Sequence, residues 1–264
     1  MRTSIVLAVD LDIKPLGLGG DFEPNLMKIS NLGYDGVELM LKDPDRIDID
    51  SVKRLTQKFN LSISAIGTGL TYTVYGLSLS SPRRSIRERT VKRVKEYLEV
   101  GKELNSAIIV GSIKGKVKNR ETGIKNLRNG LKRCAEFAEE IRTKILIEPI
   151  NRYESNLINT IEEAIKLEEE LDSHRVEVMA DTFHMNIEEK SIYDSIVKAG
   201  SHLQHIHFAD SNRCAPGQGH LNFRKIVRAL KEINYRNFIT AEILPLPNQY
   251  CAAKLTIEHI KPLI

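Results

Sequence analysis

Four apolar, strand-like segments in the second half of the chain each carry a side chain that could bind a metal ion. Glu148 follows the run Ile-Leu-Ile, Asp181 ends the next apolar segment, and His207 and Glu242 lie in the two segments after that. A carboxylate at the end of a buried strand is costly unless it meets a metal ion, another cation or a substrate. Residues of these types on four consecutive strands therefore predict a shared polar site.

The predicted site has the chemistry of a divalent metal centre. Three carboxylates at one point would repel one another unless a cation lay between them. Oxygen ligands with one imidazole suit Mn²⁺, Mg²⁺ or Co²⁺ better than a closed, thiolate-rich zinc site. Each residue alone has an ordinary explanation, because strand-end acids often cap helices or form ion pairs, and His205 and His207 share one strand face. Without a metal site, four separate ordinary explanations would have to be true at once, which is a weaker hypothesis than one shared site. We therefore predict that Glu148, Asp181, His207 and Glu242 bind one metal ion.

The elements that must position these residues alternate along the whole chain. Strand-like segments occupy residues 4–10, 36–41, 62–68, 107–113, 145–147, 176–181, 203–209 and 238–243. Helix-like segments occupy residues 24–31, 49–59, 85–104, 121–141, 160–171, 192–199, 223–233 and 249–260. Eight βα units in 264 residues predict an α/β fold, a (β/α)₈ TIM barrel forming a single domain over residues 1–264. The long loop at 69–82 is either a lid over the mouth of the barrel or an ordinary connector.

A doubly wound open sheet is the alternative fold. It would be favoured by a glycine-rich fingerprint after the first strand, but the glycines at 17, 19 and 20 lack the GxGxxG spacing. In a barrel, by contrast, the carboxyl ends of all strands point to one mouth, which is where barrel enzymes place their active sites. The four candidate ligands would then converge.

Composition limits the class of partner. The net charge is a mild +4. Basic residues are densest at 83–95, where their spacing is typical of the solvated face of an amphipathic helix. A phosphate-binding or nucleic-acid-binding patch is the alternative interpretation of this segment. No apolar run approaches the roughly 18 residues of a membrane span, and the first residues do not resemble a signal peptide. Three cysteines without CxxC spacing favour a reducing compartment. We therefore expect a cytoplasmic protein with no nucleic-acid or membrane partner.

The motifs around the predicted ligands resemble those of a known enzyme family. EPINRYE at 148–154, DTFH at 181–184, HFADSNR at 207–213 and Glu242 are similar in type and spacing to the D-tagatose 3-epimerase (ketose 3-epimerase) family of xylose-isomerase-like TIM barrels. The 5-keto-L-gluconate epimerase branch has similar spacing. One departure is Asn222, where an acidic residue is more usual. The resemblance covers the four ligands and, through the barrel pattern, the whole chain.

The resemblance implies a role for each site residue. One divalent metal per chain, foremost Mn²⁺ with Co²⁺ or Mg²⁺ as alternatives, would bind the four predicted ligands. Glu148 and Glu242 would form the catalytic acid/base pair, and Glu154, His184 and Arg213 would contact the sugar oxygens. Members of the family tend to form homodimers or homotetramers. We therefore expect a homo-oligomeric isomerase of carbohydrate metabolism.

The implied reaction inverts C3 of a ketose or a keto-sugar acid. Inversion next to a ketone requires removal of a proton and its return on the opposite face, through a metal-bound enediolate that the cation stabilises. Two carboxylates on opposite sides of the carbon can exchange the donor and acceptor roles. A keto acid or a phosphorylated ketose would need a cation for its anionic group, for which Arg83, Arg84 and Lys114 are available.

Other functions on the same barrel remain open at this point. An aldose–ketose or hydroxypyruvate-type isomerase generally needs a second metal site, but only Asp181, His184 and Asn186 follow the sixth strand. An endonuclease IV type of barrel needs three zinc ions and more strand-end histidines. A non-enzymatic binding barrel would lack one or more of the four ligands. These three alternatives are therefore weaker than the epimerase.

Some side chains have two interpretations. Glu38, inside an apolar strand, could line the mouth of the barrel, although a structural hydrogen-bonding role is favoured. Arg213 could form a loop ion pair with Asp210 instead of contacting substrate, and Glu154 could pair with Arg152. For both Arg213 and Glu154, the substrate contact is the favoured interpretation.

Overall fold

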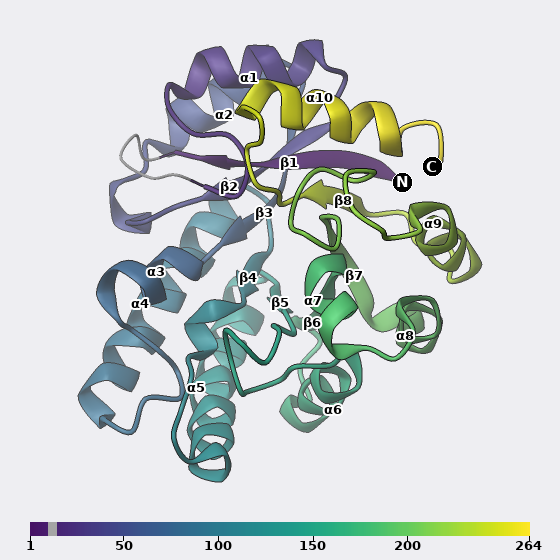
Figure 1. Cartoon of the computed structure of the whole chain (residues 1–264). Helices are drawn as coiled ribbons and strands as arrows, with labels where there is room; N and C mark the ends of the chain where they lie inside the picture. The colour runs from purple at the N-terminus through teal and green to yellow at the C-terminus, as the bar shows by residue number, and fades with distance from the viewer. Residues whose placement is uncertain (10–14) are drawn as a thin grey trace.

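The computed structural model describes residues 1–9 and 15–264 and forms a closed barrel of eight parallel strands with helices around it (Figure 1). The strands are β1 (Arg2–Ala8), β2 (Gly36–Met40), β3 (Ser62–Gly67), β4 (Ile108–Val110), β5 (Ile145–Ile147), β6 (Val176–Asp181), β7 (Leu203–Phe208) and β8 (Phe238–Ala241). Each strand pairs with the next in sequence, and β8 closes on β1. The predicted TIM barrel is confirmed. Residue 10, the last of the predicted first strand, lies outside the described residues.

The helices are α1 (Phe22–Asn31), α2 (Ile49–Lys58), α3 (Gly69–Tyr75), α4 (Arg84–Glu103), α5 (Arg120–Ile141), α6 (Ile161–Leu171), α7 (Thr182–Glu188), α8 (Ile192–Ala199), α9 (Phe223–Glu232) and α10 (Gln249–Ile260). All but α3 and α7 agree with predicted helices to within about two residues. The prediction that 69–82 is a continuous loop is wrong in its first half, where α3 forms. Tyr75, in the last turn of α3, donates its hydroxyl to Asp43, and Gly76 ends the helix in the left-handed conformation. α7 begins directly at the end of β6 because Asp181 caps it.

The interior of the barrel is divided into an apolar and a polar part. A buried cluster fills the side formed by β3 to β6, and it consists of Ala65, Ile109, Leu146 and Met179. The strands on the other side carry buried polar side chains instead, namely Ser4, Glu38, His205, His207 and Thr240. The larger hydrophobic core lies between the strands and the surrounding helices. This division means that β1, β2, β7 and β8 support the polar site from below.

Strand register brings the predicted ligands to one end of the barrel. Asp181 of β6 pairs directly with His207 of β7, so their side chains share one level of the barrel. Glu148 and Glu242 each follow the last residues of their strands, β5 and β8. Within the described residues, every helix is too short or too polar to cross a membrane.

Candidate metal centre and active site

The four predicted ligands converge at the mouth of the barrel. One ligand atom from each of Glu148, Asp181, His207 and Glu242 lies within 4.8 Å of the others, and all except Glu242 are buried. His207 Nδ1 is central, at 3.1 Å from a Glu242 oxygen, 3.5 Å from an Asp181 oxygen and 3.7 Å from a Glu148 oxygen. The structure therefore brings together side chains that are up to 94 positions apart in the sequence (242 − 148).

These separations fit a single divalent cation. At bond lengths of about 2.1 Å, neighbouring ligand atoms around an octahedral ion are roughly 3.0 Å apart and opposite ones roughly 4.2 Å apart. The observed separations of His207 Nδ1 from its three carboxylate neighbours lie in this range. The donor set of three carboxylates and one imidazole also suits Mn²⁺, Co²⁺ or Mg²⁺. The residues present thus fit the expected ion on both geometry and chemistry.

Asp181 serves two functions with its two oxygens. Oδ1 accepts hydrogen bonds from the backbone N–H groups of Phe183 at 2.8 Å and His184 at 3.3 Å, which caps α7. Oδ2 faces His207 and Arg213. The helix-capping explanation for a strand-end acid is therefore correct for one oxygen, and the other oxygen remains available as a ligand.

Arg213 contacts two of the predicted ligands directly. Its Nη1 donates to Asp181 Oδ2 at 2.5 Å and its Nη2 donates to Glu242 Oε2, while the guanidinium lies 5.0 Å from the centre of the Phe183 ring. The alternative pair with Asp210 is not formed, because Asp210 accepts backbone N–H groups from its own loop. Arg213 has a positive φ of 64°, and its side chain points back into the mouth, where it contacts Asp181 and Glu242.

Asn151 joins two of the predicted substrate contacts and was not singled out by sequence. Its Nδ2 lies 2.7 Å from Glu154 Oε1 and 2.8 Å from His184 Nδ1. Glu154 therefore pairs with this amide instead of Arg152, which forms an ion pair with Glu188. Asn151 is buried whereas Glu154 is exposed, so the amide anchors an acidic side chain at the rim of the site.

Glu148 is enclosed by Gly111, which the sequence did not indicate, and by Lys114, which the sequence offered as a cation for an anionic substrate. A Cβ on Gly111 would lie 2.0 Å from Glu148 Oε2, so only glycine leaves room for this carboxylate. Lys114 is fully buried, and its Nζ donates to the backbone carbonyls of Gly111 and Glu148. The ammonium thereby ties the end of β4 to the end of β5.

Comparison with known proteins identifies the family. The sequence profile of the xylose isomerase-like TIM barrel family matches residues 26–262. The chain is 32% identical to the D-psicose 3-epimerase of Ruminiclostridium cellulolyticum over 235 residues, which are 84% of this chain and 78% of that protein. The chain belongs to the ketose 3-epimerase family of these barrels. The predicted family and the predicted enzyme class, a carbohydrate epimerase, are confirmed.

Two further ketose 3-epimerases extend the likeness. The D-psicose 3-epimerase of Enterocloster bolteae is 42% identical, but over only 124 residues, 47% of this chain and 40% of that protein. Among solved structures, the D-allulose 3-epimerase of Methylomonas sp. superposes with a TM-score of 0.83 at 25% identity, covering 100% of this chain and 98% of that one. The family is thus shared over the barrel as a whole.

The charges around this epimerase-family centre shift the acidities of its ligands. Burial raises the pKa of Glu148 to about 8, opposed by His207 and assisted by Glu242 and Asp181. Burial would also raise the pKa of Asp181, but the guanidinium of Arg213 together with His184 and His207 outweighs it, and the pKa is held well below its usual value. For His207, burial favours the neutral ring, yet the surrounding carboxylates raise its pKa well above the usual value. A cation must therefore displace protons from Glu148 and His207.

Metal affinity should fall as the pH is lowered from 8 to 6. Below a pKa of about 8, Glu148 holds a proton that a metal ion must displace, and each displaced proton weakens the apparent affinity by up to about tenfold per pH unit. The pKa of His207 is also raised, so a second proton is displaced there, and we expect Mn²⁺ to bind about 10²- to 10⁴-fold more weakly at pH 6 than at pH 8 by isothermal titration calorimetry. In the metal-free protein, the raised pKa of Glu148 means that its proton stabilises the folded state. This contribution to the free energy of unfolding is complete below pH 4.5, the ordinary pKa of a glutamate, and is lost as the pH rises through 8. An affinity that does not change between pH 6 and 8 would contradict this assignment.

Proposed function

We propose that this protein inverts the configuration at C3 of a free ketose by moving a proton between the two faces of that carbon. The observation that supports this most directly is the convergence of Glu148 and Glu242 on one centre. Their strands, β5 and β8, are separated by two strands on one side of the barrel and by four on the other. The two carboxylates therefore reach the centre from different directions, as removal and return of a proton on opposite faces require.

In this mechanism one carboxylate removes the C3 proton and the other returns a proton from the opposite side. A divalent cation held by Glu148, Asp181, His207 and Glu242 would polarise the ketone and the neighbouring hydroxyl, which makes the C3 proton more acidic. Arg213 would donate to the oxygen on which negative charge develops. The roles of Glu148 and Glu242 exchange when the reaction runs in the reverse direction.

His184 and Glu154 would complete the substrate contacts. His184 is buried beside the ligands, and burial lowers its pKa, which favours the neutral ring. Asn151 lies within hydrogen-bonding distance of both side chains. It would hold the imidazole and the carboxylate at a fixed separation for adjacent sugar oxygens.

The charges around the mouth favour a neutral sugar over a keto acid or a phosphorylated ketose. Lys114, which could have neutralised an anionic group, donates instead to two backbone carbonyls and is fully buried. Arg83 and Arg84 are exposed at the start of α4. The names of the matched relatives, D-psicose and D-allulose 3-epimerase, agree with a ketohexose. We therefore place a free ketose ahead of the anionic alternatives.

The identity of the metal ion and the oligomeric state are proposed from the family resemblance, and the domain organisation and the location from the sequence. Mn²⁺ is the proposed ion, with Co²⁺ or Mg²⁺ as alternatives, at one per chain. Residues 1–264 are proposed to form one domain that assembles into a homodimer or homotetramer. A cytoplasmic location agrees with the free thiols of Cys134, Cys214 and Cys251.

Deuterium exchange tests the proposed reaction. Purified, Mn²⁺-loaded protein is incubated in D₂O with a panel of ketohexoses, ketopentoses, a keto-sugar acid and a phosphorylated ketose, and proton NMR follows each C–H. We expect loss of the C3–H signal and appearance of the C3 epimer for a free ketose, both stopped by a chelator and restored by Mn²⁺. Exchange confined to C1 would favour an aldose–ketose isomerase, and no exchange across the panel would contradict the enzyme proposal.

A further inference from the structure

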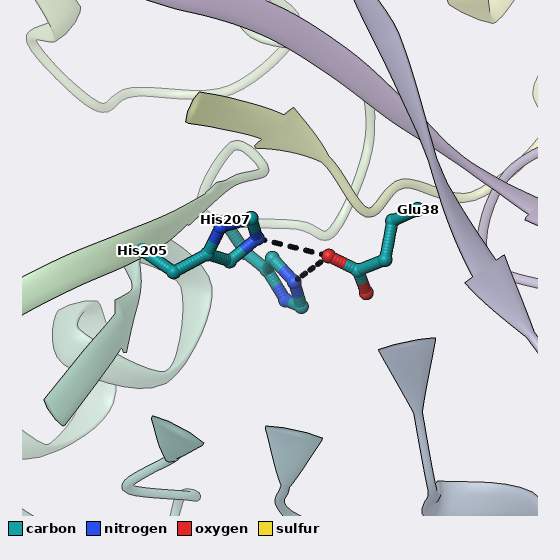
Figure 2. Close-up of side chains that lie close together, drawn as sticks. All are labelled: Glu38, His205 and His207. Atoms are coloured by element: carbon teal, nitrogen blue, oxygen red, sulfur yellow. Dashed lines mark hydrogen bonds and ion pairs between the residues drawn. The ribbon is translucent and has the colours of Figure 1, made fainter. Parts of the chain in front are cut away.

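Glu38 lies inside the barrel, below the predicted metal ligands, and contacts two histidines at once. Its Oε2 is 2.9 Å from the Nε2 atoms of both His205 and His207, as Figure 2 shows. All three side chains are at most 3% exposed. Glu38 belongs to β2 and the histidines to β7, so the contact spans the interior of the barrel. A carboxylate buried this deeply requires such partners.

The geometry at His207 separates its two ring nitrogens by function. Nε2 faces Glu38, whereas Nδ1 faces the Glu148, Asp181 and Glu242 carboxylates. When Nε2 carries the proton and donates it to a carboxylate, Nδ1 of the neutral ring keeps its lone pair free for a metal ion. The position of Glu38 thus selects the tautomer in which His207 can act as a ligand.

Glu38 is itself held in place by the second histidine, His205. His205 Nε2 lies 3.0 Å from Thr240 Oγ1, and Thr240 Oγ1 lies 2.6 Å from Ser4 Oγ. These side chains, fully or almost fully buried, come from β1, β7 and β8. His205 makes both contacts with the same Nε2 atom, so the single N–H there is shared between Glu38 Oε2 and Thr240 Oγ1, and this joins Glu38 to the wall of the barrel. Such a network fixes the carboxylate in one rotamer, which in turn fixes the plane of the His207 ring.

We propose that Glu38 is a positioning residue that orients His207 toward the metal ion and thereby sets the metal affinity of the site. This inference rests on the proposed metal centre, because it assigns Glu38 an effect on the ion and none on the substrate. Residues that orient metal-bound histidines typically change metal affinity by about 10- to 100-fold when they are replaced. Glu38 should therefore affect how much metal is needed for activity, and leave turnover at saturating metal nearly unchanged.

The test replaces Glu38 by glutamine, which keeps the shape of the side chain and removes its charge. We expect Glu38→Gln to weaken Mn²⁺ binding about 10- to 100-fold by calorimetry. The matched control is Glu177→Gln, which removes a carboxylate from β6 that pairs with Lys144 and should leave the affinity unchanged. Circular dichroism and a thermal melt confirm that both variants are folded. If Glu38→Gln does not fold, Glu38→Asp keeps the charge but shortens the side chain by one methylene, and it should weaken binding in the same direction.

The outcomes distinguish this inference from the proposed function. If the wild-type protein binds no divalent ion, the proposed metal centre is wrong, and the inference about Glu38 is wrong with it. Wild-type protein that binds one ion, with Glu38→Gln binding equally tightly, would overturn the inference and leave the metal centre intact. Two ions per wild-type chain, with the second lost in Glu38→Gln, would show that Glu38, His205 and His207 form a metal site of their own, and would also overturn the positioning role. Turnover of Glu38→Gln measured against Mn²⁺ concentration provides a further check. The Mn²⁺ concentration that gives half-maximal turnover should rise, while kcat at saturating Mn²⁺ should change by less than about threefold.

Discussion

The Glu242→Gln variant should lose turnover by about 10²- to 10⁴-fold, the contribution expected from a general acid or base. Glutamine keeps an oxygen near the metal position but cannot accept and return a proton at neutral pH. The fold should be preserved, because Arg213 keeps its ion pair with Asp181 and one of three mutually repelling carboxylates is removed. We therefore expect a melting temperature within about 3 °C of the wild type, equivalent to a change of about 1 kcal/mol or less.

Isotope exchange makes this expected result more specific. If Glu148 and Glu242 each serve one face of C3, Glu242→Gln should still exchange the C3 proton of the one epimer whose C–H faces Glu148, without forming the other epimer. Metal occupancy must be measured for each variant, since Glu242 is also a predicted ligand. Glu177→Gln, at a distance from the mouth, should keep full turnover and serves as the control. Turnover within about tenfold of the wild type in a metal-loaded Glu242→Gln variant would show that Glu242 is not an acid or base.

The barrel and the residues proposed as metal ligands were predictable because each depends on a local pattern. Strand and helix alternation is visible in windows of about ten residues, and a charged residue such as Glu148 or Asp181 at the end of an apolar run stands out without knowledge of its neighbours. Once the barrel was assumed, its topology supplied the convergence, since all strands end at one mouth. The same logic could not supply distances or hydrogen-bond partners.

The supporting residues were not predictable because their partners come from distant parts of the chain. Asn151 was visible in the sequence, but its contact with His184 depends on how α7 begins. The role of Gly111 depends on the Glu148 carboxylate, which lies just after the neighbouring strand β5. Glu38 did give a sequence signal, as a carboxylate within the apolar run of β2, yet its two histidine partners are 167 and 169 residues away. Local patterns therefore indicate that such residues need partners without identifying them.

Replacing Arg213 by methionine should separate the stability of the site from its activity. The guanidinium contacts Asp181 Oδ2 and Glu242 Oε2, the same two oxygens that face His207 Nδ1. Removing one partner of a buried ion pair typically destabilises a protein by about 3–5 kcal/mol, because the remaining charges lose their compensation. We therefore expect the free energy of unfolding of metal-free Arg213→Met, measured by denaturant titration, to be lower than that of the wild type by about 3–5 kcal/mol.

Added metal should reverse the loss of stability in Arg213→Met but not the loss of turnover. A positive charge next to the metal position opposes binding of a cation, so its removal should tighten Mn²⁺ binding by at least about tenfold. Tighter binding stabilises the folded state in proportion to the logarithm of that affinity. Turnover should still fall by about 10²-fold or more, because the donor to the developing negative charge is missing. The control is Arg152→Met. The guanidinium of Arg152 is largely exposed in its pair with Glu188, so its loss should cost about 1 kcal/mol and leave metal binding unchanged. Unchanged or weaker Mn²⁺ binding in Arg213→Met would mean that the guanidinium does not compete with the metal ion for Asp181 and Glu242.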